Sequence, residues 1–336
     1  MINIGIMGFG RVGRDIYRLA VESEDLKVTA VSDLANPEIL LYLLNNESIK
    51  DSQFHLEENY LFNDQFSTRI VRGIEPGDVP WEVFDVDIVV DATQKYKYPK
   101  ELHKHINSGA KRVILSTLPN EGIDKLIVFG VNEGSAKSSD KIVSAGSSTA
   151  NAFALALSIL NEVVDINCAN MTSIHAYTSD QPLQDVAGKS FRRSRSAAEN
   201  IIPNEDHSVQ WIETILPQFK NKITASALNV PVQKGSLMDL TTVINEQNLS
   251  AEDINAIFIE AASKRPELIE ITHDPIVSSD VIGNRHSIVF DTLATLKSGS
   301  NLVKTLSWYD NGLSHACRIL DVIRLYHNLD MKEENK

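Results

Sequence analysis

The chain has 336 residues, 43% of them hydrophobic and 23% charged, which is typical of a globular protein and enough for two domains of about 150 residues. Its 32 basic and 45 acidic residues give a net charge of −13, so no general basic surface is expected for nucleic acid. The sequence shows no signal-peptide pattern and no apolar run that could span a membrane. These features predict a soluble, cytoplasmic protein without nucleic-acid or membrane partners.

The first half of the chain alternates short apolar strands with helical segments. Strands are expected at residues 2–7, 28–31, 87–91, 112–115 and 126–131, and an amphipathic helix at residues 14–22. This order is typical of a mostly parallel sheet covered by helices. Later segments are longer, with a helix at 149–162, strands at 169–178, 225–230 and 237–245, and a final amphipathic helix at 311–327. The change predicts that a second domain begins near Ser148.

A glycine-rich motif lies between the first strand and the first helix. Gly8 can make the turn, Gly10 lets the backbone approach a pyrophosphate, and Gly13 permits close packing of the helix. The helix that follows would present its first backbone N–H groups, near Arg11 and Val12, to the phosphates. The context of a strand before the motif and a helix after it predicts a dinucleotide site.

Asp33 stands at the end of the second strand, 33 − 13 = 20 residues beyond Gly13. A carboxylate at this spacing would accept hydrogen bonds from the adenosine ribose. It would also repel the 2′-phosphate of NADP, so NAD is the expected cofactor. The alternative is that Asp33 only caps a turn.

Several further blocks of sequence make the assignment specific. These are GFGRVGR, then SAGSSTAN at residues 144–151, HAYT at 175–178, RRSRSAAENIIP at 192–203 and WYDN at 308–311. Taken together and in this order, they resemble glyceraldehyde-3-phosphate dehydrogenase almost from end to end. The resemblance implies an α/β fold with a Rossmann-type NAD-binding domain, residues 1–147 and 311–336. It also implies an α+β catalytic domain with a mixed or antiparallel sheet, residues 148–310.

The same resemblance assigns roles on the cofactor side. Asn311 matches the residue that holds the nicotinamide carboxamide, and Thr93 lies in a turn of the cofactor site. Residues 178–201 match the family's S-shaped loop, which lines the cofactor site of a neighbouring subunit. A homotetramer with NAD as cofactor and a small-molecule substrate is therefore implied.

The resemblance fails at the catalytic nucleophile, because Ser148 stands where the family has cysteine. A hydroxyl is a weak nucleophile near neutral pH, so this change should cost several powers of ten in rate. His175 is retained at the position of the family's base and could activate Ser148. Alternatively, Ser148 is only the N-cap of a helix that starts at Thr149, and His175 an ordinary packed histidine. The two cysteines, Cys168 and Cys317, are expected to be buried and inert, and nothing suggests a metal site.

The anion-binding positions have changed as well. Asn229 replaces the arginine that binds substrate phosphate, and Asp206 and His207 replace a threonine-glycine pair at the second phosphate. Lys234 could restore charge, although a solvated lysine is the simpler interpretation. The family's remaining substrate-side residues are matched by Ser147, Thr149, Thr178, Asp180 and Arg193.

Two further changes lie near the nicotinamide position. A gapless match of Arg318 with the family's arginine places His315 where a tyrosine normally packs, and Gln94 replaces a glycine. The substrate pocket thus differs around an intact cofactor motif.

Three functions follow from these differences. The first is an NAD-dependent dehydrogenase for a small aldehyde or alcohol, with His175 as general base and without a thioester. The second is a catalytically silent NAD-binding homologue that acts as scaffold, sensor or subunit of a mixed oligomer. The third is weak phosphorylating glyceraldehyde-3-phosphate dehydrogenase activity through Ser148. The first is favoured, because His175, Asp33 and Asn311 would be surplus in a scaffold.

Overall fold

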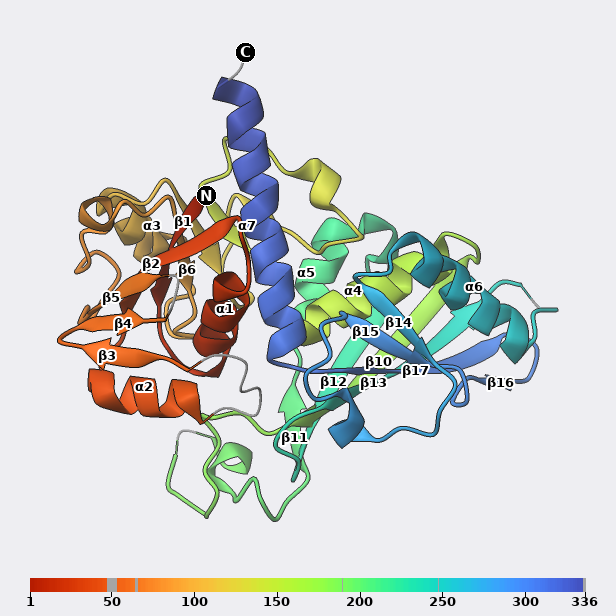
Figure 1. Ribbon diagram of the computed structural model, residues 1–336. Coiled ribbons are helices and arrows are strands. Elements are labelled where there is room, and N and C mark those ends of the chain that lie inside the picture. Colours follow the sequence, from red (N-terminus) through yellow and green to blue (C-terminus); the bar gives the residue numbers. More distant parts are fainter. Residues whose placement is uncertain (47–52, 64–65, 189, 247, 335–336) are drawn as a thin grey trace. The chain divides into compact units, whose positions relative to one another are not determined.

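The computed structural model describes residues 1–46, 53–63, 66–188, 190–246 and 248–334. Contacts divide the chain into two compact units (Figure 1). Unit 1 comprises residues 1–127, 132–147 and 316–336, and unit 2 comprises residues 128–131 and 148–315. In the part of the chain described, no helix is long and apolar enough to cross a membrane. Nor does any group of three His, Cys, Asp or Glu side chains there provide a metal site.

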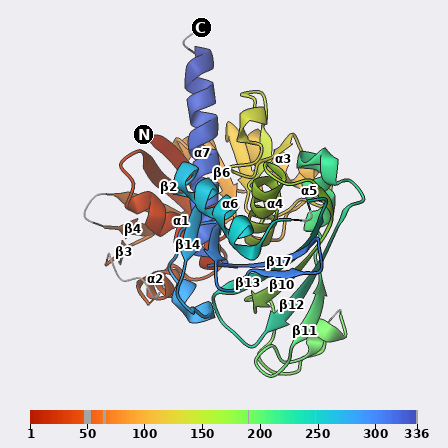
Figure 2. The same cartoon turned by 90° about the vertical axis from the view of Figure 1, so that its right-hand side faces the viewer.

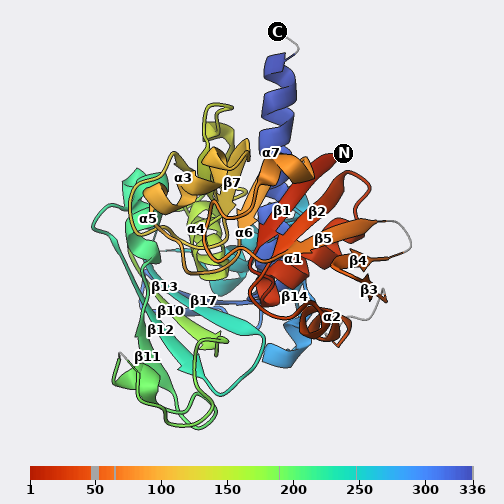
Figure 3. The ribbon, with the colours of Figure 1, turned by 90° about the vertical axis from the view of Figure 1, so that its left-hand side faces the viewer.

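Unit 1 is built on one sheet, whose described residues form nine strands in the order β3-β4-β5-β2-β1-β6-β7-β9-β8. Figure 3 shows β3, β4, β5, β2 and β1 of this sheet side by side. Their bounds are β1 Ile2–Met7, β2 Leu26–Ser32, β3 His55–Glu57, β4 Tyr60–Phe62, β5 Ser67–Val71, β6 Ile88–Asp91, β7 Arg112–Leu115, β8 Lys125–Leu126 and β9 Ile142–Ser144. Pairing is parallel from β5 to β8, and β3 and β4 add an antiparallel edge. The parallel order confirms the predicted Rossmann-type sheet.

Helices complete unit 1 by burying their apolar faces on this sheet. The helices are α1 Arg11–Val21, α2 Pro37–Asn45 and α3 Pro99–Asn107, with short 3-10 turns at η1 Trp81–Phe84 and η2 Glu133–Ser135. In α1, Ile16, Tyr17 and Leu19 are buried, as expected for residues spaced on one helical face. The last helix, α7 Leu313–Glu334, is longer than its predicted span, and most of it belongs to unit 1.

Unit 2 has a mixed sheet in the order β11-β12-β10-β13-β17-β15-β14, with β16 paired to β17, among its described residues. Its strands are β10 Ile166–Ala176, β11 Ile202–Glu205, β12 Ile223–Val230, β13 Ser236–Ile244, β14 Ile269–Thr272, β15 Ile288–Asp291, β16 Leu296–Ser298 and β17 Leu302–Tyr309. Its helices are α4 Ser148–Asn161, α5 Ser208–Ile215 and α6 Ala251–Lys264, with 3-10 turns at η3 Arg192–Ser194, η4 Pro217–Phe219 and η5 Ser278–Val281. These three α-helices lie on one face of the sheet (Figures 1 and 2). The predicted α+β domain with a mixed sheet is confirmed.

Three local predictions were wrong. The strand expected at 126–131 ends at Leu126, because a turn with a positive φ at Gly130 follows it. Helix α4 starts at Ser148, so Ser148 lies in the first turn and does not cap a helix that begins at Thr149. Cys168 is exposed, because the register of β10 shifts between Ile166 and Cys168 and turns this side chain outward.

Candidate active site

A glycine-rich loop joins β1 to α1 at the carboxyl edge of the parallel sheet in unit 1. Gly8 has a φ of +92°, and a Cβ built on it would lie 2.8 Å from the backbone nitrogen of Thr93. A Cβ at Gly13 would lie 2.2 Å from the carbonyl oxygen of Gly8. At Gly10, apart from its chain neighbours, no heavy atom of the described chain lies within 4 Å of such a Cβ. These environments suit a tight turn, close helix packing and an open approach for a ligand.

The N-terminus of α1 starts at this open position. Gly10 is the N-cap residue and has an extended backbone, and the described first turn contains no acidic residue. The backbone N–H groups of the first turn, which includes Arg11 and Val12, therefore meet no carboxylate of their own turn. A helix N-terminus of this kind attracts anions, so these residues fit the pyrophosphate of a dinucleotide.

Asp33 holds the glycine-rich loop to the end of β2. One carboxylate oxygen accepts a hydrogen bond from the backbone N–H of Phe9 at 2.7 Å, and the other accepts one from Ala35 at 2.9 Å. A carboxylate can accept about four hydrogen bonds, so two backbone donors leave capacity for ribose hydroxyls. Asp33 is thus a turn residue, and its half-buried carboxylate also has the chemistry to bind an adenosine ribose.

The turn that follows β6 packs against the same loop. Thr93 donates hydrogen bonds to Asp91 from its backbone nitrogen at 3.0 Å and from its hydroxyl at 2.6 Å. The next residue, Gln94, has a φ of +61°, in the left-handed region that glycine adopts most readily. A side chain in this conformation costs about 1–3 kcal/mol, which the surrounding contacts must offset.

In unit 2, a group of buried hydroxyls surrounds the end of β17. The Tyr309 hydroxyl lies 2.9 Å from the hydroxyl of Thr149 and 2.9 Å from that of Ser173. Burial raises the pKa of Tyr309 to about 12, so the phenol remains neutral at physiological pH. Ser148, next to Thr149 in the first turn of α4, is also buried. The cluster therefore holds the start of α4 against the central strands of the sheet.

His175 lies near the end of β10, with its ring 6.4 Å from the ring of Tyr309. Its Nδ1 is 2.6 Å from the carbonyl oxygen of Ala176. A carbonyl can only accept a hydrogen bond, so Nδ1 carries the proton and Nε2 has the lone pair in the neutral ring. The side chain is half-buried. This tautomer is the one that a general base acting through Nε2 requires.

The predicted loss of an anion site falls beside His175. Asn229 is the register partner of His175 in the parallel pair of β10 and β12, and it is buried. Its carbonyl oxygen accepts a hydrogen bond from the side chain of Asn204 at 3.3 Å. Asp206 accepts a hydrogen bond from the backbone N–H of Ser208 at 2.7 Å, and its negative charge adds to the raised pKa of Tyr309. The two predicted anion-binding positions thus carry a neutral amide, at Asn229, and a carboxylate, at Asp206.

Three of the predicted substrate-side residues come together on the segment after β10. The guanidinium of Arg193 forms an ion pair with Asp180, and the hydroxyl of Thr178 donates a hydrogen bond to the same carboxylate. Burial raises the pKa of Asp180, but the hydrogen bond from Thr178 and the positive charge of Arg193 outweigh it and lower the pKa overall. The charge of this arginine is therefore balanced within the chain.

Asn311 follows β17 in a turn fixed by its neighbour. Asp310 accepts hydrogen bonds from the backbone N–H groups of Gly312 at 2.8 Å and Leu313 at 3.0 Å, at the start of α7. The side chain of Asn311 is buried, and its carbonyl oxygen finds no hydrogen-bond donor among the described residues. A buried acceptor of this kind is costly unless a ligand satisfies it, so Asn311 fits the amide N–H of a nicotinamide carboxamide.

Sequence reasoning did not single out three of the residues that organise these groups. Tyr309 and Asp310 lie inside the WYDN block, which was assigned only through Asn311, and Asp91 lies two residues before Thr93. The short spacing of these three residues from predicted site residues was the available signal. Lys234, by contrast, has no role in the contacts described above.

The chain is similar to known proteins over almost its whole length. Residues 2–99 match the family model of the glyceraldehyde 3-phosphate dehydrogenase NAD binding domain, and residues 147–311 match that of its C-terminal domain. The chain is 34% identical to glyceraldehyde-3-phosphate dehydrogenase 1 of Bacillus subtilis, over 96% of this chain and 97% of the relative. The corresponding enzymes of Borreliella burgdorferi and Mycobacterium leprae are each 34% identical, over 96% of this chain and 98% of theirs.

Proposed function

Because the chain belongs to the glyceraldehyde-3-phosphate dehydrogenase family, whose cofactor is NAD, we propose that it oxidises a small alcohol or aldehyde without a covalent thioester. The observation that carries this proposal is the tautomer of His175, whose Nδ1 is bonded to the carbonyl of Ala176. The resemblance places Ser148 at the position of the nucleophile. A base that takes a proton directly from the substrate needs no nucleophile.

The reaction that these residues support is a proton abstraction coupled to loss of hydride. Nε2 of His175 takes the proton from a hydroxyl of an alcohol or of an aldehyde hydrate. The C–H bond on the same carbon then breaks with its electron pair, and the carbonyl double bond forms. A bound oxidised NAD would supply the acceptor for this hydride. Thr178, Asp180, Arg193, Ser147 and Thr149 are proposed to bind the substrate, and Asn311 the nicotinamide amide.

The substrate is inferred to carry less negative charge than a sugar phosphate. Asn229 supplies an amide beside His175, and Asp206 supplies a carboxylate close enough to affect Tyr309. The ion pair with Asp180 already engages the charge of Arg193. Because a phosphate beside Asp206 would be repelled, a polyol or an amine-bearing carbonyl compound fits these groups better.

Replacement of Ser148 by alanine should leave the rate of NADH formation within about threefold of wild type on the best substrate of a panel of small alcohols, aldehydes and amino aldehydes. If Ser148 were the nucleophile, its loss would cost at least about a thousandfold in kcat. NADH absorbance measures the rates of the wild type and of Ser148→Ala, each with and without inorganic phosphate. Ser158→Ala is the matched control, because it removes a hydroxyl near the other end of α4 that has no role in the proposed site, and it should leave this rate unchanged.

Two results would argue for the other functions. Phosphate-dependent turnover of glyceraldehyde 3-phosphate that disappears in Ser148→Ala would indicate the phosphorylating reaction through serine. Tight NAD binding with no NADH formed from any compound of the panel would indicate a catalytically silent homologue. The panel therefore separates the three possibilities.

We also infer a cytoplasmic homotetramer, with residues 1–147 and 311–336 as cofactor domain and residues 148–310 as substrate domain. The segment from residue 178 to residue 201 exposes large apolar side chains in the single chain, and Phe191 is 100% exposed. The others are Leu183, Val186 and Ile201. An exposed apolar group of this kind is typical of a subunit interface. Sedimentation equilibrium should give about four times the chain mass of 37.3 kDa, and a monomer mass would contradict the inference.

A further inference from the structure

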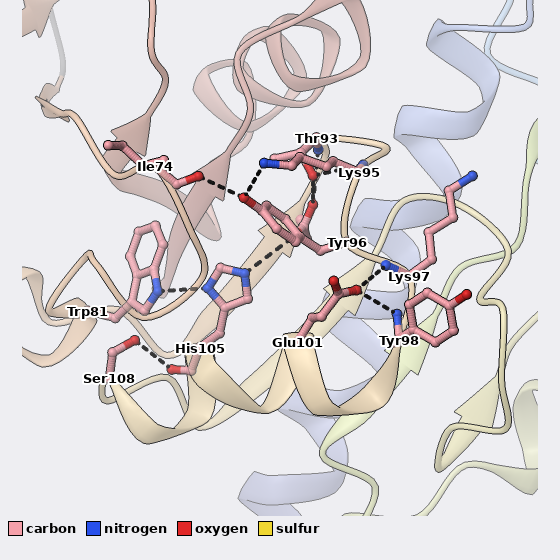
Figure 4. Close-up of polar contacts among 11 residues, drawn as sticks. Ile74, Trp81, Thr93, Lys95, Tyr96, Lys97, Tyr98, Glu101, His105 and Ser108 are labelled. Atoms are coloured by element: carbon pink, nitrogen blue, oxygen red, sulfur yellow. Dashed lines mark hydrogen bonds and ion pairs between the residues drawn. The ribbon is translucent and has the colours of Figure 1, made fainter. Parts of the chain in front are cut away.

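A buried chain of hydrogen bonds runs from η1 through α3 to the end of β6 in unit 1 (Figure 4). The indole Nε1 of Trp81 donates to Nδ1 of His105 at 3.0 Å, and Nε2 of His105 lies 3.3 Å from a carboxylate oxygen of Asp91. All three residues are 0% exposed. A buried polar group is costly unless it is hydrogen-bonded, so a chain of this kind is kept only where each member has its partner.

Trp81 determines which ring nitrogen of His105 carries the proton. An indole N–H can only donate, so Nδ1 of His105 must be the acceptor and the ring is neutral with its proton on Nε2. Nε2 therefore donates to Asp91. The other carboxylate oxygen of Asp91 accepts both hydrogen bonds from Thr93, so donors from α3 and from the turn hold the same carboxylate.

Asp91 connects this chain to the wall of the dinucleotide site. It ends β6, next to Met7 at the end of β1, and the backbone N–H of Ala92 donates to the carbonyl of Met7 at 2.8 Å. The hydroxyl of Thr93 also accepts a hydrogen bond from the backbone N–H of Lys95 at 3.1 Å. Residues 92–93 touch Gly8 closely enough that no Cβ would fit between them. The turn at residues 93–95 and the glycine-rich loop thus form two adjoining walls.

The conformation of this turn needs outside support. Gln94 at its centre is in the left-handed region, which a residue with a side chain adopts only when its surroundings impose it. Thr93 donates a hydrogen bond to Asp91 and accepts one from the backbone N–H of Lys95, so the residues on either side of Gln94 are fixed. Asp91 in turn is oriented by His105, which is oriented by Trp81.

We propose that Trp81, His105 and Asp91 are positioning residues for NAD, which set the Thr93 turn against the glycine-rich loop. The inference rests on the proposed placement of Thr93 in the cofactor site, and it does not depend on which reaction the protein catalyses. It is tested by NAD binding in the absence of substrate. A failure here would therefore leave the proposed chemistry at His175 untouched, and failure of that chemistry would leave NAD binding unchanged.

The test compares three substitutions on α3 by calorimetric titration with NAD. His105→Leu removes both hydrogen bonds while it keeps an apolar side chain in the core, and should raise the Kd for NAD about tenfold. His105→Gln has a carbonyl that can accept from Trp81 and an N–H that can donate to Asp91, so its Kd should stay within about threefold of wild type. His103→Leu, on the exposed side of the same helix, is the matched control and should not change the Kd.

A double-mutant cycle separates positioning from general stability. In Thr93→Val the hydroxyl that Asp91 holds is gone and only the backbone N–H of residue 93 can still donate to Asp91, so adding His105→Leu should raise the Kd for NAD by less than about tenfold. If the effects of the two substitutions on the free energy of NAD binding are additive, so that their factors in Kd multiply, the hydrogen-bonded residues do not act through Thr93 and the proposal is overturned. An unchanged Kd in His105→Leu, measured well below its melting temperature, would overturn it as well. If His105→Leu does not fold, Trp81→Phe gives the same decision, with an expected rise in the Kd for NAD of about fivefold, above the range expected of His105→Gln.

Discussion

Replacement of His175 by alanine will lower kcat for substrate oxidation by about 10²–10⁴-fold, the range expected when a positioned general base is lost. The reason is that Nε2 has the lone pair in the tautomer fixed by the bond from Nδ1 to Ala176. The Kd for NAD, measured by titration, should remain within about twofold, because the glycine-rich loop and Asp33 belong to unit 1. Steady-state NADH formation on the best substrate of the panel gives the comparison.

A matched control for this substitution is His273→Ala. His273 is also in unit 2, but it is exposed, and its Nδ1 lies 2.9 Å from the hydroxyl of Thr292. It should leave kcat unchanged. The pH profile adds a second criterion: the wild-type rate should fall on the acid side as the base is protonated, and this limb should be absent in His175→Ala. Undiminished turnover in His175→Ala would remove this residue from the mechanism.

Local patterns account for the parts of the cofactor side that the sequence predicted. The glycine spacing and the distance to Asp33 lie within one βα unit, so neighbouring residues determine the geometry. The alternation of strands and helices likewise predicted a parallel sheet, although in the segment at 126–131 the strand ends at Leu126 and residues 129–131 form a turn. Its apolar composition resembles that of a strand, and only the conformation at Gly130 shows the difference.

The substrate side depended on contacts between distant segments. Tyr309 joins Thr149 and Ser173, which lie 160 and 136 residues before it, and no local pattern shows that these hydroxyls meet. The ion pair between Arg193 and Asp180 was not predicted either, since the sequence suggested that the charge of Arg193 was available to the substrate. Once it is paired, its charge no longer counts fully toward an anion site. The sequence could therefore nominate candidate residues for the site but not show how their charges balance.

Replacement of Gly13 by alanine will destabilise the cofactor side, although alanine normally favours a helix over glycine by about 1 kcal/mol. The new Cβ would lie 2.2 Å from the carbonyl oxygen of Gly8, a backbone atom that cannot rotate away. Overpacking costs about 1–3 kcal/mol, and the upper end is expected here because backbone must move. The helix propensity of alanine offsets about 1 kcal/mol of this cost, so the free energy of unfolding should fall by about 2 kcal/mol. Because Gly8 must shift, the Kd for NAD should rise at least about tenfold. Urea unfolding and NAD titration measure the two effects.

Gly10→Ala is the matched control, because it separates packing from ligand approach. Its Cβ would meet no heavy atom of the described chain within 4 Å apart from its chain neighbours, so the free energy of unfolding should stay close to that of wild type. The Kd for NAD should nevertheless rise, because the side chain enters the space through which a pyrophosphate reaches the start of α1. Equal unfolding curves for Gly13→Ala and wild type would show that α1 can move away from the loop without cost. In that case the close contact between Gly8 and Gly13 would not be what fixes the geometry of the cofactor site.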